Sequence, residues 1–185
     1  MNITYEKATE KDAYAISYIG AYSWKETYTG LVPDNYLEYK VNHFEDKVEN
    51  QKKVIQNENV DFYLAKVDGK AVGYVCYGPS ENEKYEDYGY VGGLYLLEEY
   101  QGYGIGKELF RIALEGLKEK GYTKLMLECM SGNKVIDFYK KYLGKVVEKM
   151  DYPLNNGKIS VGAEVMTFDI EDSLKEISES KNKTM

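Results

Sequence analysis

The sequence of 185 residues has two cysteines, one histidine, three prolines and no long hydrophobic run. A membrane-spanning helix needs about 20 consecutive apolar residues, so we expect no membrane contact. The N-terminal residues carry no apolar signal segment, which favours a cytoplasmic protein. Cys76 and Cys129 stand singly in apolar segments, without metal-ligand spacing. We therefore expect buried thiols, no disulfide and no metal site.

Positive charge is also in short supply. There are 24 Lys and Arg residues against 31 Asp and Glu, for a net charge of −7. Nucleic-acid binding depends on neutralising phosphates, so this balance disfavours it. The excess of acidic groups favours steering of a cationic partner, such as a polyamine, although acidic surfaces also maintain solubility. The length fits one domain with a buried core.

The order of predicted elements defines the fold class. Alternating or apolar segments bounded by turn residues predict strands at residues 3–8, 60–67, 70–78, 88–97, 122–130, 145–149 and 163–169. Helical spacing predicts helices from Thr9 toward Trp24, from Pro33 to Val41, within 45–59, from Lys107 to Gly121 and from Asn133 to Tyr142. Asp68-Gly69 predicts a hairpin turn, and Asn155-Asn156-Gly157 another turn. This is an α/β protein with a mixed, mostly antiparallel sheet.

All of these elements fall within a single domain, residues 1–170. From Glu171 onward charged residues dominate and apolar residues become sparse. Chain ends of this kind are poorly ordered unless something holds them down, so residues 171–185 are expected to form a frayed, charged tail.

A glycine-rich segment, Gln101-Gly102-Tyr103-Gly104-Ile105-Gly106, joins an apolar strand to an amphipathic helix. Glycine lets the backbone adopt positive φ and approach a ligand closely, and a helix start presents unpaired N–H groups. Together these features predict a phosphate cradle made of backbone. The spacing differs from the dinucleotide-binding fingerprint, and Gly106-Lys107-Glu108 lacks the hydroxyl of a Walker loop. The same six residues also fit a plain tight connection.

The surroundings of this loop narrow its interpretation. A strand over 124–129, then Asn133, the pair Phe138-Tyr139 and Gly144 follow in that order, and a helical region with Trp24 precedes it. Together with a loop of the form Gln/Arg-x-x-Gly-x-Gly/Ala, this arrangement resembles the GCN5-related N-acetyltransferase (GNAT) superfamily, bacterial small-molecule or peptide type. The resemblance covers roughly residues 2–170. It implies the GNAT fold, with two central strands splayed apart and helices on both sides, and acetyl-CoA as the acyl donor.

The resemblance also implies which residues hold the donor. The pyrophosphate would lie on the backbone of Gln101, Gly102, Tyr103, Gly104, Ile105, Gly106 and Lys107. The pantetheine arm would pair with the backbone of Leu94, Tyr95 and Leu96. Asn133 would contact the same arm, or it would cap the following helix. Tyr139 would contact the donor and act as general acid toward the leaving thiolate, unless its ring only fills space.

The acceptor implied by the resemblance is a primary amine of a small molecule or a peptide. Candidate contacts are Trp24, Tyr28, Tyr90 and Glu128, although Trp24 could equally be a packing residue. Tyr90 stands where some members carry a glutamate base, so Glu128, Glu26 or a water chain through Tyr90 could take that role. The alternatives are a non-catalytic acyl-CoA sensor and a transferase of a longer acyl group. The protein is expected to be a monomer or a homodimer.

Overall fold

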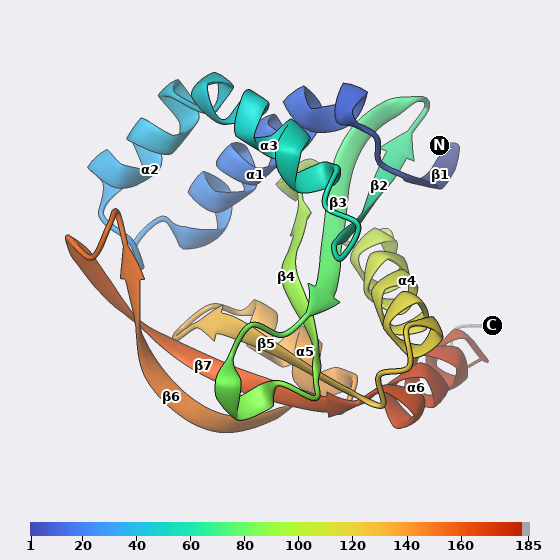
Figure 1. Ribbon diagram of the computed structural model, residues 1–185. Helices are drawn as coiled ribbons and strands as arrows, with labels where there is room; N and C mark the ends of the chain where they lie inside the picture. Colours follow the sequence, from blue (N-terminus) through green and yellow to red (C-terminus); the bar gives the residue numbers. More distant parts are fainter. Residues whose placement is uncertain (183–185) are drawn as a thin grey trace.

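The structure of the protein, a computed structural model, describes residues 1–182 (Figure 1). Its strands are β1 (Ile3–Lys7), β2 (Asp61–Val67), β3 (Lys70–Pro79), β4 (Gly89–Leu96), β5 (Lys124–Met130), β6 (Lys145–Leu154) and β7 (Ile159–Asp169). Its α-helices are α1 (Ala13–Tyr28), α2 (Asp34–Asn42), α3 (Val48–Ile55), α4 (Ile105–Glu119), α5 (Val135–Lys141) and α6 (Ile170–Asn182). Short 3-10 turns lie at η1 (Glu10–Asp12), η2 (Glu45–Lys47), η3 (Glu83–Tyr85) and η4 (Glu98–Tyr100). Within residues 1–182, no helix is long and apolar enough to cross a membrane.

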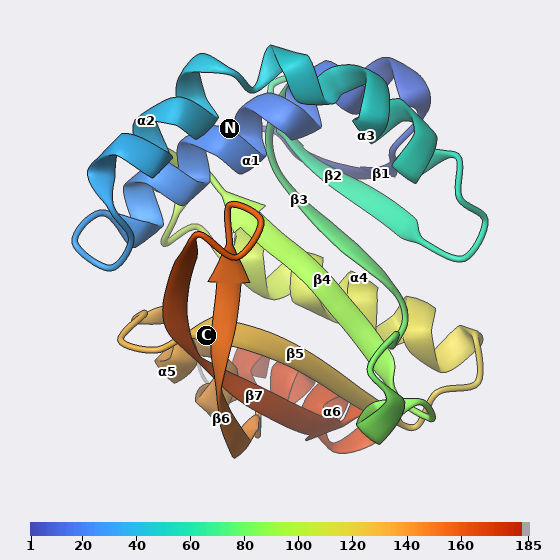
Figure 2. The same cartoon turned by 60° about the vertical axis from the view of Figure 1, so that its left-hand side comes forward.

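The seven strands form one sheet in the order β1-β2-β3-β4-β5-β7-β6. Every neighbouring pair is antiparallel except β4 and β5, which are parallel and pair only through Gly89 with Leu125 and Tyr90 with Met126. The two central strands meet at one end and diverge toward the other (Figure 2). The predicted fold class, including the splay, is confirmed.

Helices cover the two faces of the sheet with separate cores. On one face α4 contributes Leu109 and Phe110 to a large apolar cluster that also holds residues of α5, β5, β7 and α6. On the other face α1 presents Ile16 and Ile19, spaced three residues apart on one side of the helix, to Tyr74 of β3 and its neighbours. The amphipathic spacing of each helix therefore fixes which face of the sheet it covers.

The β6–β7 hairpin is longer than the sequence suggested. β6 continues past residue 149 to Leu154, and β7 begins at Ile159 rather than at residue 163. The predicted turn joins them, with Asn155, Asn156 and Gly157 all at positive φ. The hairpin extends beyond β5 toward α2 (Figure 1), and its extra residues become part of the site described below.

The prediction of a frayed C-terminal tail is wrong for residues 171–182, which belong to α6. Ile170 and Ile177 are fully buried, with Leu174 packed against the same cluster. Their spacing of four and three residues places them on one face of a helix, and this face rests against α4. Ser173 donates a hydrogen bond to the carbonyl of Tyr142 at 2.9 Å. The last three residues of the predicted tail lie outside the described part of the chain.

Candidate active site

β4 is the strand around which the candidate site is arranged. It pairs with β3 along its length but with β5 only at Gly89 and Tyr90, so most of its second edge is unpaired by any strand. An extra residue, Gly92, interrupts the register with β3 at the start of this free edge. A bulge of this kind bends a strand and increases its twist, which gives the splay a local cause.

Only alternate residues of β4 present backbone groups at the free edge. The Leu97 N–H donates to the Val72 carbonyl at 3.1 Å, which fixes the alternation along the strand. Tyr95 therefore directs its backbone groups toward β3, whereas Leu94 and Leu96 direct theirs toward the open edge. The expectation that Tyr95 offers its backbone to a ligand is corrected, because antiparallel pairing already uses those groups.

The glycine loop has the conformation that glycine favours. Gly102 and Gly104 have φ angles of +83° and +81°, and an added Cβ at either would meet no atom within 4 Å. Glycine is thus favoured there by backbone conformation and not by lack of space. The surroundings of both residues are open, as a loop that receives a ligand requires.

The start of α4 leaves backbone donors free. Gly104 is the N-cap, and the first N–H with a helical partner is that of Glu108, which donates to the Gly104 carbonyl at 3.1 Å. The N–H groups of Ile105, Gly106 and Lys107 precede it and have no carbonyl within the helix to bond. They carry the partial positive charge of the helix dipole, so an anion is favoured in front of them.

Gln101 is already engaged inside the protein. Its N–H donates to the Glu98 carbonyl at 3.0 Å, and its side-chain amide donates to the Leu96 carbonyl at 3.3 Å. Gln101 therefore holds the turn against the end of β4. A ligand could bond its backbone N–H or its side-chain amide only by displacing these two hydrogen bonds. Tyr103 is 59% exposed and leaves the mouth of the loop accessible.

Asn133 stands just before α5 and caps it. Its side-chain oxygen accepts the N–H of Val135 at 3.0 Å, and the residue is buried. The Asn133 side chain therefore bonds the first N–H of α5, as the capping alternative expected, although the N-cap position itself is Lys134. The same side chain also hydrogen-bonds Tyr28, and this contact opposes the rise in the pKa of that tyrosine, so the NH₂ group donates to the Tyr28 hydroxyl.

Tyr139 of α5 is buried in an aromatic cluster. Its ring packs edge-on against Phe110 at 5.4 Å and Phe168 at 5.9 Å between ring centroids. Burial raises the pKa of Tyr139 well above its ordinary value, with smaller contributions from Cys129 and then Tyr28. The hydroxyl consequently stays protonated at neutral pH.

A small cavity of about 50 Å³ adjoins the splay and includes both Cys129 and Tyr28. Aromatic rings from three elements, α1, β4 and β6, line it: Trp24, Tyr28, Tyr90, Tyr95 and Tyr152. The indole N–H of Trp24 donates to the Tyr95 hydroxyl at 2.9 Å, which ties α1 to β4 across the cavity. Glu128 supplies the only carboxylate among the described residues that line it.

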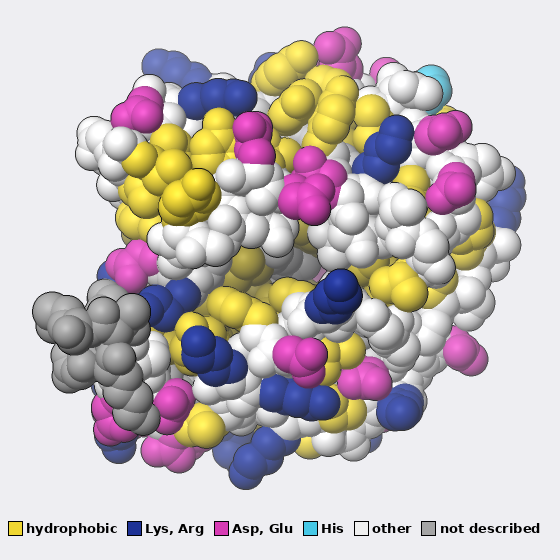
Figure 3. All heavy atoms as spheres, turned by 180° about the vertical axis from the view of Figure 1, so that it is seen from behind, with side chains coloured by type: hydrophobic (Ala, Val, Ile, Leu, Met, Phe, Trp, Pro, Cys, Tyr) yellow, Lys and Arg dark blue, Asp and Glu magenta, His cyan; other side chains and the backbone are white. Residues whose placement is uncertain are grey.

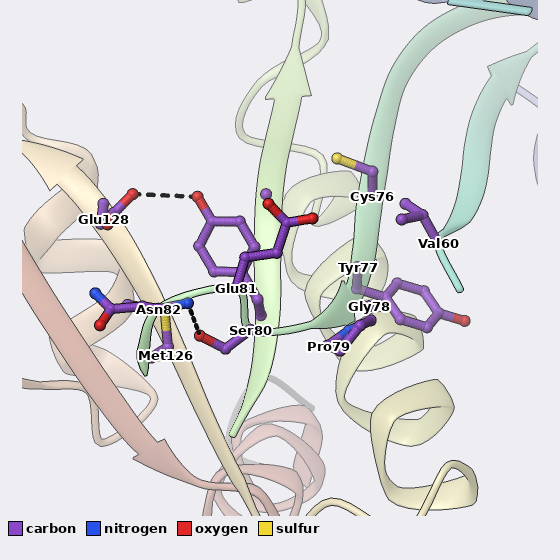
Figure 4. A pocket seen from close by; sticks show the side chains of 12 residues that line it. Val60, Cys76, Tyr77, Gly78, Pro79, Ser80, Glu81, Asn82, Met126 and Glu128 are labelled. Atoms are coloured by element: carbon purple, nitrogen blue, oxygen red, sulfur yellow. Dashed lines mark hydrogen bonds between the residues drawn. The ribbon is translucent and has the colours of Figure 1, made fainter. Parts of the chain in front are cut away.

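A larger cavity of about 440 Å³ lies beside the small one (Figure 4). Its walls come from the end of β3, the loop that follows β3, and the paired ends of β4 and β5. Tyr90, Gly92 and Glu128 line both cavities. The two spaces therefore meet at the start of the splay, and they form one acceptor-sized site on the sheet face opposite α4.

Glu128 and Tyr90 form a hydrogen-bonded pair at this junction. The Tyr90 hydroxyl donates to a Glu128 carboxylate oxygen at 3.2 Å, drawn as a dashed line in Figure 4. Burial, and next the charge of Glu128, raises the pKa of Tyr90, so the hydroxyl keeps its proton and remains a donor. The carboxylate is thereby held with its second oxygen available to a bound molecule.

Glu26, the other carboxylate considered from the sequence, and His43, the one histidine, both lie elsewhere. Glu26 accepts the backbone N–H of Glu98 at 3.0 Å and lines neither cavity. His43 pairs with Asp46 at 3.0 Å on the surface of the helical region. Of the carboxylates named from the sequence, Glu128 alone lines the cavities.

Several cavity residues were not predicted as site residues from the sequence, among them Cys76, Glu81 and Tyr152. Tyr152 lies on the same face of β6 as Met150 and Leu154, with exposed residues between them, so the alternation of a strand at 150–154 could have predicted that it points inward. Glu81 stands in a charged loop where nothing local distinguishes it from its neighbours. Burial raises the pKa of Cys76 to about 12, so this thiol is protonated and unreactive at neutral pH.

Two sequence comparisons bear on the class of protein. The sequence profile described as "Acetyltransferase (GNAT) family" matches residues 21–144. A curated relative, the uncharacterized N-acetyltransferase YuaI of Bacillus subtilis (strain 168), is 31% identical over 149 residues, which cover 76% of this chain and 79% of that one. The chain belongs to the GNAT acetyltransferase family, and it is an N-acetyltransferase by class.

Solved structures agree with the fold. The PaiA N-acetyltransferase from Thermoplasma acidophilum, solved in complex with coenzyme A, has a TM-score of 0.71 at 24% identity, over 91% of this chain and 99% of that chain. The ribosomal-protein-S18-alanine N-acetyltransferase from Escherichia coli has a TM-score of 0.62 at 17% identity, over 91% and 94%. At these identities the likeness concerns the fold alone.

Proposed function

We propose that this protein transfers the acetyl group of acetyl-CoA to a primary amine of a small molecule or a peptide, by direct attack of the amine on the thioester. One observation carries the proposal. The free edge of β4 leads directly to unpaired N–H groups at the start of α4, and the Glu128 cavities open at the same splay from the opposite face. A donor and an acceptor can therefore meet at one point from two sides.

The free backbone groups suit a long, anionic acyl carrier. The N–H groups of Ile105, Gly106 and Lys107 would hold the two linked phosphates. Leu94 and Leu96 would bond the amides of the carrier's arm as an added strand does, and the NH₂ group of Asn133 would support that arm. Acetyl-CoA supplies an activated acyl group with a thiolate as its leaving group. The complex of PaiA N-acetyltransferase with coenzyme A agrees with such a carrier for this fold.

Glu128 is the group that accepts a proton from the acceptor. An alkylammonium has a pKa of about 10.4, so at neutral pH nearly all of it is protonated and unable to attack. Glu128, oriented by Tyr90, accepts that proton directly or through a water molecule before the attack and passes it to solvent. The neutral amine then forms the C–N bond as the C–S bond breaks, and the second proton that the nitrogen must lose leaves to solvent through the same carboxylate. Tyr90 is then a positioning residue, in the place where the resemblance to the family implies a glutamate for some members.

Tyr139 donates a proton to the departing thiolate and recovers one from solvent. A phenol is a weaker acid than a thiol by about 1.5 pKa units in water, which makes this transfer uphill by about 2 kcal/mol. Burial raises the pKa of Tyr139. The same surroundings also raise the proton affinity of a thiolate formed beside it, so the difference between the two need not widen.

Binding and turnover together test the proposal. Titration of the purified chain with acetyl-CoA should release or absorb heat, and free thiol should appear only when an amine is added, in a panel of alkylamines, diamines and peptides with free N-termini. No binding by a folded sample would refute the proposal. Binding without thiol release across the panel would point to a non-catalytic acyl-CoA sensor, and preference for succinyl-CoA would point to a longer acyl group.

A further inference from the structure

The two joined cavities differ greatly in size. The small cavity of about 50 Å³ is far below the range of about 300–1,000 Å³ that ligand sites usually have, so it suits the reacting end of an acceptor and not the whole molecule. The remainder of any acceptor must lie in the larger cavity of about 440 Å³, which falls within the usual range for ligand sites. The residues of the larger cavity therefore recognise the part of the acceptor that lies beyond its reacting nitrogen.

The larger cavity is walled by two carboxylates that come from separate elements. Glu128 lies on β5, and Glu81 projects from the loop after β3 over the same space (Figure 4). Among the described residues that line either cavity, none is Lys, Arg or His. Glu81 and Glu128 also make no ion pair with any side chain that the structure describes.

The missing counter-charge is specific to the cavity. Close to Glu81 in sequence, Lys84 pairs with Glu148 of β6. On the other side of the larger cavity, Asp61 of β2 pairs with Lys7 and with Lys120. On the face seen in Figure 3, basic side chains likewise lie among acidic ones. Cations are thus available around the cavity but are absent from its walls.

This arrangement discriminates between kinds of acceptor. An acceptor that carries a carboxylate would meet two like charges with no cation to offset them, which is unfavourable. A metal ion is a poor alternative occupant, because the described residues contain no group of three potential ligands. A monoamine would satisfy Glu128 alone and leave Glu81 unused. A flexible molecule with two ammonium groups would match both carboxylates at once.

We infer that the acceptor of this enzyme is a slender dication: one amino group enters the small aromatic cavity beside Glu128, and a second ammonium group lies against Glu81 in the larger cavity. The inference rests on the function proposed above and adds the substrate class. Glu81 is then a specificity-determining residue that takes no part in bond making.

Paired substrates test the inference. We expect the purified full chain to acetylate 1,5-diaminopentane with a kcat/KM about fivefold or more above that of pentylamine, since a second ion pair in a partly open site contributes at this level. Two equivalent amino groups account for only a factor of two. A series from 1,3-diaminopropane to 1,8-diaminooctane should show an optimum length that reports the span between the carboxylates.

Glu81→Gln is the decisive variant, and its exposed loop position makes misfolding unlikely to confound the result. It should lower the diamine-to-monoamine ratio toward the statistical factor of two, mainly by raising the KM of the diamine. Glu83→Gln removes the same charge from the neighbouring exposed turn without touching the cavity, and should leave the ratio at its wild-type value. An equal ratio in both variants, or a wild-type ratio near two, would overturn the inference.

A binding measurement separates this inference from the proposed function. Isothermal titration of the coenzyme A-loaded protein with 1,5-diaminopentane and with pentylamine needs no turnover. Tighter binding of the diamine in the wild type, lost in Glu81→Gln, would support the dication site even if no amine were acetylated. Acetylation of both amines with no difference in binding would leave the proposed function intact and refute the dication site.

Discussion

The two sides of β4 are constructed from different parts of the chain. On the side that leads to α4, the available groups are the backbone N–H and C=O of Leu94, the N–H of Leu96 and the N–H groups of the helix start, all within one short segment. On the opposite side the groups are side chains from α1, β3, β4, β5 and β6, which are far apart in sequence. One side is local and made of backbone, whereas the other is dispersed and made of side chains.

This difference has a consequence for what each side recognises. Backbone groups cannot be exchanged by substitution, so the side toward α4 suits a ligand that stays the same among related enzymes. Side chains can be replaced one at a time without disturbing the sheet, so the cavity side suits an acceptor that differs from enzyme to enzyme. Substitutions should accordingly have chemical effects on the cavity side and conformational effects on the loop side.

The largest expected effect is on the cavity side, at Glu128. Glu128→Gln keeps the size of the side chain but removes its capacity to accept a proton, so kcat/KM for the best amine should fall about 100-fold or more in a thiol-release assay. Glu26→Gln is the matched control, because its amide oxygen can still accept the Glu98 N–H, and its activity should stay near wild type. Equal losses in both variants would argue that Glu128 is not the proton acceptor.

The local side could be predicted from the sequence because its signals are contiguous. The glycine pattern, the preceding apolar strand and the following amphipathic helix are neighbours in the chain, and the structure has each of these elements in place. The one correction, at Tyr95, arises because the alternation of backbone direction depends on the register with β3. That register is set by the bulge at Gly92, which the sequence does not display.

The dispersed side was predicted only in part. Trp24, Tyr28, Tyr90 and Glu128 do line the small cavity, but Tyr152 and Glu81 reach the site through pairings that are distant in sequence. The C-terminal helix is a different case, because Ile170, Leu174 and Ile177 already had helical spacing. The low number of apolar residues in this segment led to the prediction of a frayed tail. Three apolar residues on one face of a helix are nevertheless enough to anchor it on an existing core.

The second effect in size concerns Tyr139, which is buried in the core on the α4 side of the sheet. Tyr139→Phe preserves the packing against Phe110 and removes only the hydroxyl, so turnover should fall by about tenfold or more through loss of the proton donor. The dissociation constant of acetyl-CoA, measured by calorimetry, should change by less than about twofold, since an interaction absent from the ground state does not affect binding. Unaltered turnover would reduce Tyr139 to a packing residue.

The third prediction tests the loop side through its backbone. Gly104→Ala places a Cβ on a residue at φ +81°, which costs about 1–2 kcal/mol of conformational strain. If the loop relaxes to relieve that strain, the N–H groups behind it move, and the dissociation constant of acetyl-CoA should rise by about fivefold to tenfold.

Gly69→Ala is the control for that experiment. Gly69 has φ +84°, its added Cβ would also meet no atom within 4 Å, and it lies in the β2–β3 hairpin. Both variants should lose similar stability in urea unfolding, but only Gly104→Ala should weaken acetyl-CoA binding. Equal binding by the two variants would mean that the geometry of the loop does not hold the donor.

The smallest expected effect is a difference between the two sides in how a tyrosine on each changes the free energy of unfolding at alkaline pH. Burial raises the pKa of Tyr28 in the cavity to about 12, from an ordinary value of about 10. Above pH 10 the unfolded chain loses this proton while the folded chain keeps it, so the free energy of unfolding falls as pH rises between these values. The slope contributed by one such group is about 1.4 kcal/mol per pH unit.

Tyr28→Phe removes this titration, so the decline in stability between pH 10 and 12 should become shallower by up to that slope, as measured by urea unfolding at several pH values. Tyr103→Phe on the glycine loop is the matched control, because a ring that is 59% exposed stays in contact with water in the folded chain. The same change of slope in both variants would show that the alkaline response is not tied to burial in the cavity. The buried tyrosine of the cavity and the exposed tyrosine of the glycine loop would then respond to alkaline pH in the same way.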